Sequence, residues 1–251
     1  MLTKGDFQMS SILDIAINAA NACAVQAPAT LVNPTTQNDQ LFASVVNSTL
    51  DSLMRSCDWQ ALEREAVLYT TQGQKNYPLD AIAPDIYSII NASLWMKGSM
   101  RSVIGGMTQE SWRQHKQFHI PVVDVYFKIQ NNMIMFLKDP GCLEIHFGYR
   151  SNAVVMDAKT AEPKPAITAN TDIPIFDEYL VKLGITWRWL KRSGLDYAED
   201  YNEYIHELNK SYALAKSPNE INLAHVEGEI YLDEGIIANV YAENSQSCGQ
   251  E

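Results

Sequence analysis

The sequence predicts an α+β chain: a four-helix bundle of two N-terminal and two C-terminal helices, with an inserted antiparallel β-sheet domain and an extended C-terminal arm. Two observations lead to this fold class. Apolar residues recur at steps of three and four near both ends, and short β-branched and aromatic runs separated by turn residues fill the middle. The expected boundaries are 1–62 for the first helical pair, 63–171 for the insert, 172–217 for the second pair and 218–251 for the arm.

The N-terminal pair is expected as a helix from about Ser11 to Val25 and another from about Thr36 to Trp59. Ser11 and Asp14 have the spacing of a capping box, in which each residue's side chain bonds the other's backbone N–H. The residues expected to face inward are Ile12, Ile15, Ala16, Ala19, Ala20 and Cys23 in the first helix, and Phe42, Val45, Val46, Thr49, Leu53 and Cys57 in the second.

The insert is expected to consist of short strands within 66–71, 86–94, 122–129, 133–137 and 143–149. The last three of these runs are predicted to form three antiparallel strands joined by tight turns. Asn131-Asn132 is the hairpin candidate, because asparagine tolerates positive φ. The polar stretch 157–171 is expected to be a loop that returns the chain to the helical part.

The C-terminal pair is the best-marked part of the chain. Asp172 is expected to cap its first helix and Gly194 to end it, and Asp196 with Glu199 resembles a capping box for the second. The expected apolar faces are Phe176, Tyr179, Leu180, Leu183, Trp187 and Leu190 in the first helix, and Tyr197, Tyr201, Tyr204, Leu208, Tyr212 and Ala215 in the second.

Trp187 and Trp189 are two residues apart, so on a helix their indoles point about 200° apart. With Trp187 on the expected core face, Trp189 has two interpretations. It is an interface anchor together with Arg188 and Arg192, since tryptophan and arginine are enriched at binding hot spots, or it is a second core contact.

The bulk composition excludes several classes. Nineteen Lys and Arg against 30 Asp and Glu give a net charge of −11, which disfavours general attraction to nucleic-acid phosphates. No apolar run reaches the roughly 20 residues that span a bilayer, so no membrane partner is expected. The N-terminus lacks a signal-peptide pattern, and we expect a product of the cytoplasm.

Motifs of catalysis and cofactor binding are missing. The sequence contains no GxGxxG, P-loop, GxSxG or HExxH pattern, and the widely spaced cysteines form no CxxC pair. His115 and His119 are four residues apart without a third ligand, which favours two ordinary histidines near a strand over a metal site. We therefore expect neither an enzyme nor a cofactor.

Two alternatives assign a role to the insert. A hydrolase would use acidic residues near strands, with Asp124 and Glu144 as the candidates. A binding module for a glycan or a protein would present an aromatic platform of Trp95, Trp112 and Tyr126.

Several motifs occur in the order found in one family. These are the ILDIAINAA helix, the CDWQAL helix end, the strand EAVLYTTQGQKNYPLD and, most clearly, the closing segment SNAVVMDAKT followed by ANTDIPIFDEYLVKLGITWRWLKRSGLDYAEDYNEYIHELNKS. They resemble phage head-to-tail adaptor (connector or neck) proteins, of the kind that act as tail accessory factors in short-tailed phages. The resemblance covers most of residues 9–217; the large insert and the tail after Pro218 depart from the smaller adaptors.

The resemblance implies a structural virion protein, made in the host cytoplasm and placed in the neck of the particle. Copies of it would form a ring, expected to be twelve-fold, that joins the capsid portal to the tail nozzle or tube. The ring would line the channel for genomic DNA without binding it specifically. The expected contacts with other subunits or the portal are Trp187, Arg188, Trp189 and Arg192, with Ile230, Tyr231 and Leu232 in an arm that orders on docking.

Overall fold

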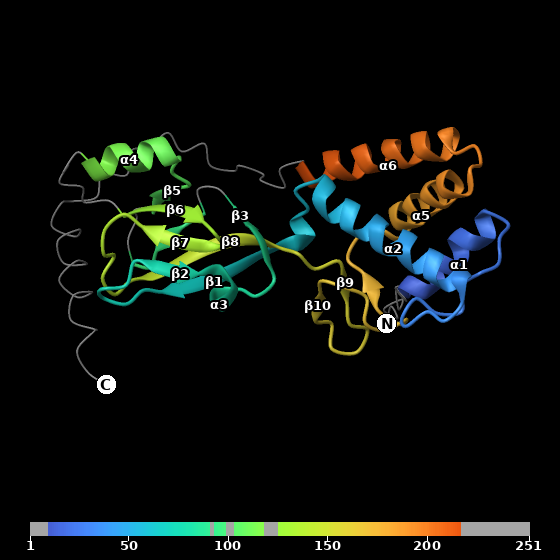
Figure 1. Ribbon diagram of the computed structural model, residues 1–251, viewed down its shortest axis with the longest axis horizontal. Coiled ribbons are helices and arrows are strands. Elements are labelled where there is room, and N and C mark those ends of the chain that lie inside the picture. Colours follow the sequence, from blue (N-terminus) through green and yellow to red (C-terminus); the bar gives the residue numbers. More distant parts are fainter. Residues whose placement is uncertain (1–9, 91–92, 99–102, 118–124, 217–251) are drawn as a thin grey trace, which may run out of the picture. The chain divides into compact units, whose positions relative to one another are not determined.

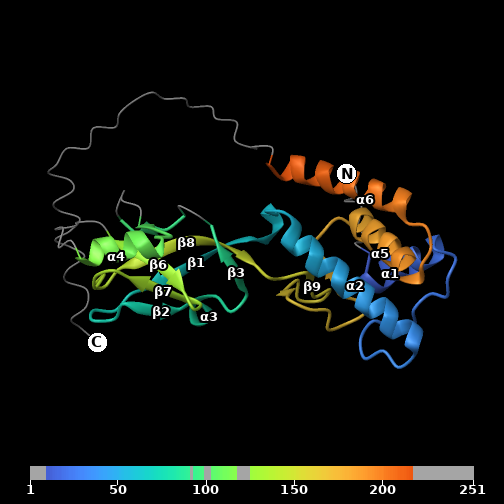
Figure 2. The same cartoon turned by 45° about the horizontal axis from the view of Figure 1, so that its top comes forward.

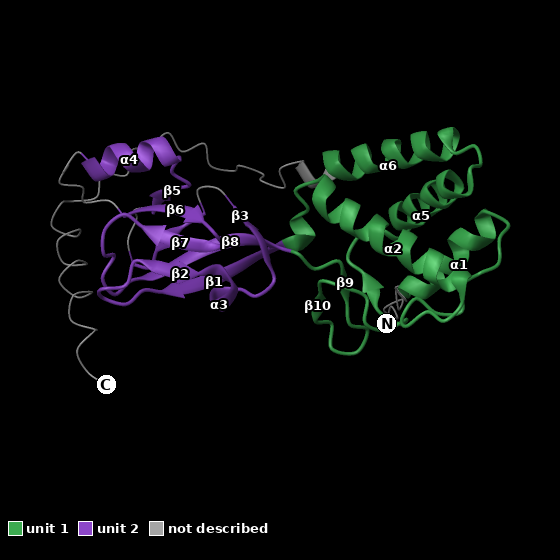
Figure 3. Cartoon of the chain, viewed as in Figure 1, with its two compact units in different colours: residues 1–62, 152–221 green, residues 63–151, 222–251 purple. Residues whose placement is uncertain are grey.

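The computed structural model describes residues 10–90, 93–98, 103–117 and 125–216, and it is a mixed α+β structure. The chain divides into two compact units (Figure 3). The helical unit contains the described residues up to Leu62 and those from Asn152 onward, and the β unit runs from Glu63 to Ser151. Within the described residues, no helix is long and apolar enough to cross a membrane.

The helical unit contains α1 (Ile12–Ala22), α2 (Gln37–Ser56), α5 (Glu178–Ser193) and α6 (Ala198–Lys216), with a short 3-10 turn at Gln60–Leu62. Helix α5 is the common neighbour, because it packs against α1, α2 and α6 (Figures 1 and 2). The residues of the first and last parts of the chain therefore share one fold unit.

Local capping explains where three of these helices begin or end. The hydroxyl of Ser11 accepts the N–H of Asp14 at 3.2 Å while the Asp14 carboxylate accepts the N–H of Ser11 at 3.3 Å, which confirms the predicted capping box. Thr36 caps α2 through the N–H of Asp39. Gly194 ends α5 in the left-handed conformation, with φ 72°, as expected.

The predicted cap at Asp172 is wrong. Residues Ile173–Pro174 form a short strand, so the chain is still extended there, and α5 is capped by Asp177, whose carboxylate accepts the N–H of Leu180 at 3.1 Å. Asp172 is instead fully buried. Its carboxylate accepts N–H groups from the loop before it, and its carbonyl accepts the N–H of Ile12 at 2.8 Å, which ties this loop to the start of α1.

A three-stranded sheet belongs to the helical unit, so the insert ends earlier in the sequence than predicted. Its strands are β9 (Val155–Met156), β10 (Pro163–Lys164) and β11 (Ile173–Pro174), in the order β10-β9-β11. The insert was expected to continue to 171, but the β unit ends at Ser151. The physical reason is that Val154 and Val155 are buried in the core of the helical unit.

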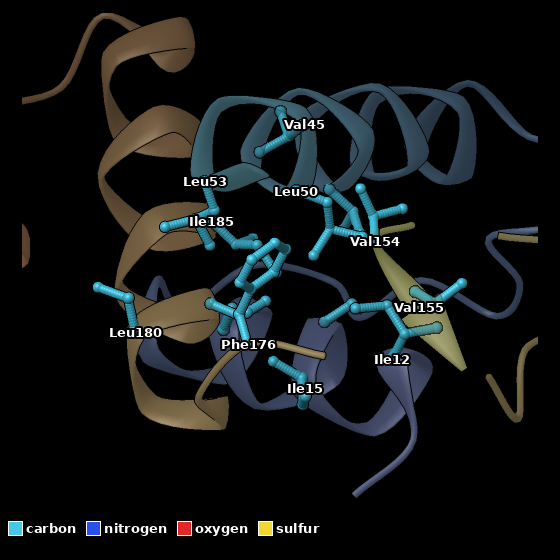
Figure 4. Close-up of a cluster of buried hydrophobic side chains, with 14 of the residues drawn as sticks. Ile12, Ile15, Val45, Leu50, Leu53, Val154, Val155, Phe176, Leu180 and Ile185 are labelled. Carbon is cyan, nitrogen blue, oxygen red and sulfur yellow. The ribbon is translucent and has the colours of Figure 1, made fainter. Parts of the chain in front are cut away.

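The core of the helical unit is shown in Figure 4, where the Phe176 ring points into the middle of a cluster of aliphatic side chains. Alanines on α1 allow a close approach, since Ala16, Ala19 and Ala20 are all completely buried. Gly184 serves the same purpose between α5 and α2, because a Cβ there would lie 2.5 Å from the Thr49 methyl. The largest fully buried residues are Ile12, Ile15, Phe42, Leu50, Leu53, Leu62, Leu180 and Ile185.

The β unit contains two four-stranded sheets. One has the order β1-β8-β3, with β4 also paired to β8; its strands are β1 (Glu63–Tyr69), β3 (Ile86–Ile89), β4 (Trp95–Met96) and β8 (Glu144–Ser151). The other has the order β2-β7-β6-β5, with β2 (Asn76–Pro78), β5 (Ile104–Gly105), β6 (Tyr126–Gln130) and β7 (Met133–Phe136). Helices α3 (Leu79–Ile82) and α4 (Gln109–Gln117) complete the described part (Figure 1).

The β unit has its own core, formed by alternate residues of these strands. Ile145, Phe147 and Tyr149 of β8 are buried, and so are Ile134 and Phe136 of β7. The residues between them on β8 are only half-buried. The first sheet thus buries one face and leaves the other partly open to solvent, as period-two alternation requires.

The predicted hairpin is confirmed, but the predicted three-stranded group is wrong. Asn131 and Asn132 have φ values of 52° and 58° and join the antiparallel strands β6 and β7. Strand β8, however, pairs with β1 instead of β7. The turn at Asp139–Gly141 carries the chain from one sheet to the other: the Asp139 carboxylate accepts the N–H groups of Gly73 and Gly141.

Candidate interaction surface

The end of α5 places its two tryptophans in different environments, and for Trp189 it confirms the second of the two interpretations, a core contact. The Trp189 ring is only 8% exposed and stacks on Phe42, with ring centroids 4.1 Å apart. Trp187, expected on the core face, is half-buried at the edge of the unit. Trp189 is therefore a core residue and offers almost no surface to a partner.

Trp187 lies among tyrosines of the next helix. Its ring centroid is 5.0 Å from that of Tyr201 in an edge-on contact, 5.9 Å from Tyr204 and 6.4 Å from Tyr197. Tyr204 is buried, whereas Tyr201 is exposed. The left-handed turn at Gly194 makes this cluster possible, because it folds α6 back onto the last turns of α5.

Basic side chains cover the same cluster. The guanidinium of Arg188 lies 4.4 Å from the centroid of the Trp187 ring and 5.6 Å from that of Tyr204, and it donates to the Gly184 carbonyl at 3.1 Å. The ammonium of Lys191 lies 5.7 Å from the ring centroids of both Trp187 and Tyr197. Cations at these distances are attracted by the electron-rich ring faces.

A pocket of about 390 Å³ opens at this place. We call it the Trp187 pocket; it is lined by Trp187, Lys191, Tyr197, Ala198, Tyr201 and Asn202. Its volume is in the range in which proteins hold a small ligand or an inserted side chain. The pocket combines aromatic walls with a cationic rim, so it suits an aromatic group that carries negative charge nearby.

The Tyr204 hydroxyl beneath the cluster is held in its neutral form. Burial raises the pKa of the Tyr204 hydroxyl, and the neighbouring Arg188 guanidinium only partly opposes this shift. The buried indole N–H of Trp187 has no protein acceptor among the described residues. The fixed positive charges of Lys191 and Arg188 thus set the electrostatic character of the pocket.

The remaining predicted contacts have different positions. Arg192 is exposed and donates to the Ser44 hydroxyl at 3.2 Å, so it links α5 to α2. Ile230, Tyr231 and Leu232 lie outside the described residues. Trp187, Arg188 and Arg192 are therefore the predicted contacts that the structure brings to the surface of one helix.

The β unit has a second aromatic surface, different from the one predicted. Trp112 of the expected platform is only 5% exposed, with the Lys128 ammonium 4.9 Å from its ring centroid. Trp95 is 48% exposed and pairs with His146 of β8. Tyr69, which is 69% exposed, pairs with Glu144 on the other side of the same strand.

Between these two rings lies an ion-paired group. The Glu144 carboxylate accepts from Lys97 Nζ at 2.9 Å, and its other oxygen is 2.9 Å from His146 Nε2. The hydrogen bond from Lys97 holds the pKa of Glu144 below its ordinary value. Such a carboxylate is unsuited to act as a general acid near neutral pH. Asp124, the other acidic candidate, lies outside the described residues.

Two further networks escaped the sequence analysis. In the helical unit, Lys164 Nζ bridges Asp157 at 2.6 Å and the buried Asp172 at 3.2 Å. In the β unit, the Asp85 carboxylate accepts from the hydroxyls of Tyr149 at 2.9 Å and Ser151 at 2.7 Å. No sequence motif marks either network: the partners of Lys164 are seven and eight residues away, and Asp85 is more than sixty residues from Tyr149 and Ser151.

The part of the chain that the structure describes contains no group of three or more histidine, cysteine, aspartate or glutamate side chains arranged to hold a metal ion. His115 lies on α4 with its Nδ1 2.9 Å from the Ser111 carbonyl, and His119 is outside the described residues.

No family model matches this sequence, and no curated protein matches it either.

Proposed function

We propose that this chain is a structural virion protein, a head-to-tail adaptor whose copies form a ring between the capsid portal and the tail. The ring is expected to be twelve-fold, to line the channel for the genomic DNA and to meet the tail nozzle or tube on its other side. In this proposal the helical unit acts as a four-helix bundle within the ring. The protein performs no catalysis and needs no cofactor.

The Trp187 pocket is the observation that carries the proposal. Tryptophan, tyrosine and arginine are the residues that dominate binding energy at interfaces, and here they share one seam between α5 and α6 that is partly open to solvent. The seam belongs to the closing segment of the chain, which is also where the resemblance to the adaptor family is most specific. We assign Trp187, Arg188 and Arg192 to contacts with a neighbouring subunit or the portal, and Ile230, Tyr231 and Leu232 to the docking arm.

The charge of the chain fits passage of DNA. A net charge of −11 repels a polyanion, so a ring of such subunits would let the genome slide without tight contacts. The two separate cores add a second supporting point, because one unit can contact the portal while the other serves a different neighbour in the particle.

The test is co-sedimentation of the full-length chain with purified particles of its cognate portal protein. We expect the chain to move with the portal fraction, and electron microscopy of that fraction to show an added ring with the rotational symmetry of the portal. A chain that stays at the top of the gradient at micromolar concentration, with its arm intact, would contradict the adaptor role.

A binding function of the β unit is the second candidate, and the exposed pair of Tyr69 and Trp95 supports it. Their rings flank the polar group of Glu144, Lys97 and His146 on one sheet face. Sugars use this combination, since their C–H faces stack on aromatic rings while hydroxyls bond to charged groups. Binding of cell-surface glycans that is lost in Trp95→Ala would support it, and glycan binding unchanged by that substitution would exclude this surface.

A further inference from the structure

The Trp187 pocket has cationic and aromatic walls, and its chemistry restricts what can fill it. Lys191 is exposed at its rim, and the ring of Tyr201 is exposed at its side. On a helix with about 100° per residue, the four α6-side lining positions fall within an arc of about 140°. The acidic side chains at 199, 200 and 203 project outside that arc, and Glu203 accepts a hydrogen bond from Tyr179 instead. The pocket therefore keeps a positive rim within an acidic protein.

An acidic segment of the same chain matches the positive charge of this rim. Residues 217–251 hold seven acidic residues and no lysine or arginine, so they carry seven of the eleven net negative charges of the chain. Within this segment, residues 227–234 read EGEIYLDE: an Ile-Tyr-Leu core flanked by two acidic residues on each side. An aromatic side chain with carboxylates around it matches an aromatic pocket with a lysine at its rim.

Chain length allows the segment to reach the pocket of its own molecule. Tyr201 lies fifteen residues before Lys216, about 22 Å back along α6. Ten residues, 217–226, separate the end of α6 from Glu227, and an extended chain of that length spans about 33–36 Å. A tether this short gives an effective concentration in the millimolar range, so even a weak site is occupied.

From these observations we infer that residues 227–234 bind in the Trp187 pocket of the same chain. The Tyr231 ring packs against Trp187 and Tyr201, and the flanking carboxylates face Lys191. This inference concerns the isolated chain and does not depend on the adaptor role.

The test is photo-crosslinking of the full-length chain with Tyr231 replaced by p-benzoylphenylalanine, followed by trypsin digestion. The tryptic peptide 193–210 contains four of the six lining residues. We expect a crosslink to this peptide in the product of monomer size. The same reporter at Tyr241, ten residues further along, is the matched control and is expected to give at least fivefold less of that product.

Charge variants test the recognition itself. Lys191→Glu is expected to lower the crosslink yield about fivefold. This factor corresponds to the loss of one solvent-exposed ion pair of the stronger kind. Adding Glu229→Lys and Asp233→Lys to that variant should restore the yield. Lys210→Glu, which removes an exposed lysine of α6 paired with Glu207, should leave the yield unchanged; its readout is the tryptic peptide 193–216, because the cleavage site at 210 is lost. Crosslinks to other peptides, no crosslink at all, or a crosslink found only in a product of dimer size would overturn the inference.

Discussion

The helical unit and the β unit both expose aromatic rings, but they assemble them in different ways. In the helical unit the aromatic cluster, of which Tyr201 is exposed, comes from eighteen consecutive residues, 187–204, on two helices joined by one turn. In the β unit the exposed rings of Tyr69 and Trp95 lie on either side of β8, whose residues are far from both in sequence. The aromatic surface of the helical unit is therefore determined by which way the residues of two neighbouring helices face. The surface of the β unit depends on the pairing of strands that are far apart in the sequence.

The two surfaces also differ in charge. The Trp187 pocket has two cations against its rings and no acidic residue in its lining. The Tyr69–Trp95 surface has a carboxylate at its centre, already paired with Lys97 and His146. An acidic or anionic partner therefore suits the helical unit, and a neutral polar ligand suits the β unit.

The largest expected effect tests whether the cores are separate. Phe42→Ala removes a completely buried ring that stacks on Trp189, and it should lower the unfolding free energy of the helical unit by about 3–5 kcal/mol. Phe147→Ala should do the same to the β unit, where Phe147 is equally buried. Hydrogen exchange read by mass spectrometry should show lost protection only in the unit that carries the substitution. Equal loss in both units for either variant would mean that they unfold as one.

A smaller effect tests the close approach of α5 and α2. Gly184→Ala puts a methyl group against the methyl of Thr49, so it should destabilise the helical unit by about 1–3 kcal/mol in chemical denaturation. Thr49→Ser removes that methyl and keeps the hydroxyl that bonds the Val45 carbonyl. The double variant should therefore be more stable than Gly184→Ala alone; a double variant that is less stable would show that another contact at Gly184 sets the cost.

Acid should weaken the β unit through Asp85. Burial alone would raise the pKa of this carboxyl, but hydrogen bonds from Ser151 and Tyr149 outweigh burial and hold the pKa below its ordinary value. The stabilisation is then complete above the unfolded pKa of about 4 and is lost as the pH falls through the lower folded value. Asp85→Asn should cost about 1–2 kcal/mol at pH 7.

The pH dependence separates this interpretation from a general loss of packing. The difference between Asp85→Asn and the unmodified chain should shrink as both are denatured at lower pH, because the carboxylate of the unmodified chain becomes protonated. Burial, followed by the bond to Asp85, raises the pKa of the Tyr149 hydroxyl to about 12, so the tyrosine stays neutral throughout. A difference that is the same at pH 7 and pH 3 would rule out the charge of Asp85 as the cause.

The smallest effect on stability is expected for surface charge. Lys191 is exposed, and Lys191→Glu should change the unfolding free energy by no more than about 0.5 kcal/mol. It should nevertheless weaken any contact that uses the Trp187 pocket. A large loss of stability in this variant would mean that Lys191 supports the fold and would remove it from the list of interface residues.

How much the sequence could predict depended on whether a feature was local. The Ser11–Asp14 capping box, the Gly194 stop and the Asn131-Asn132 hairpin were all predicted, because each depends on residues within a few positions of one another. The pairing of β8 with β1 was not, since strand register across some eighty residues has no local signal.

The exchange of Trp187 and Trp189 has a specific cause. The predicted core face of α5 included Phe176, but Phe176 lies between the short strand β11 and the start of the helix and reaches the core independently of helix phase. The helix itself buries Leu180, Val181 and Ile185, and that face continues to Trp189. Leu180 and Leu183 of the predicted face are buried as well, so periodicity found part of the buried surface, and the face through Val181, Ile185 and Trp189 was missed because α5 packs against three helices.

The most direct measurement compares the two aromatic surfaces in one assay: sedimentation velocity of the full-length chain with particles of its cognate portal protein, using Trp187→Ala and Trp95→Ala as matched variants. If the Trp187 pocket is the assembly surface, loss of its central ring should weaken portal binding by about thirtyfold or more, the cost of a hot-spot residue, and Trp95→Ala should bind as the unmodified chain does. Hydrogen exchange of the helical unit serves as the control that the Trp187→Ala chain is folded. A folded Trp187→Ala chain that binds the portal with unchanged affinity would contradict the account.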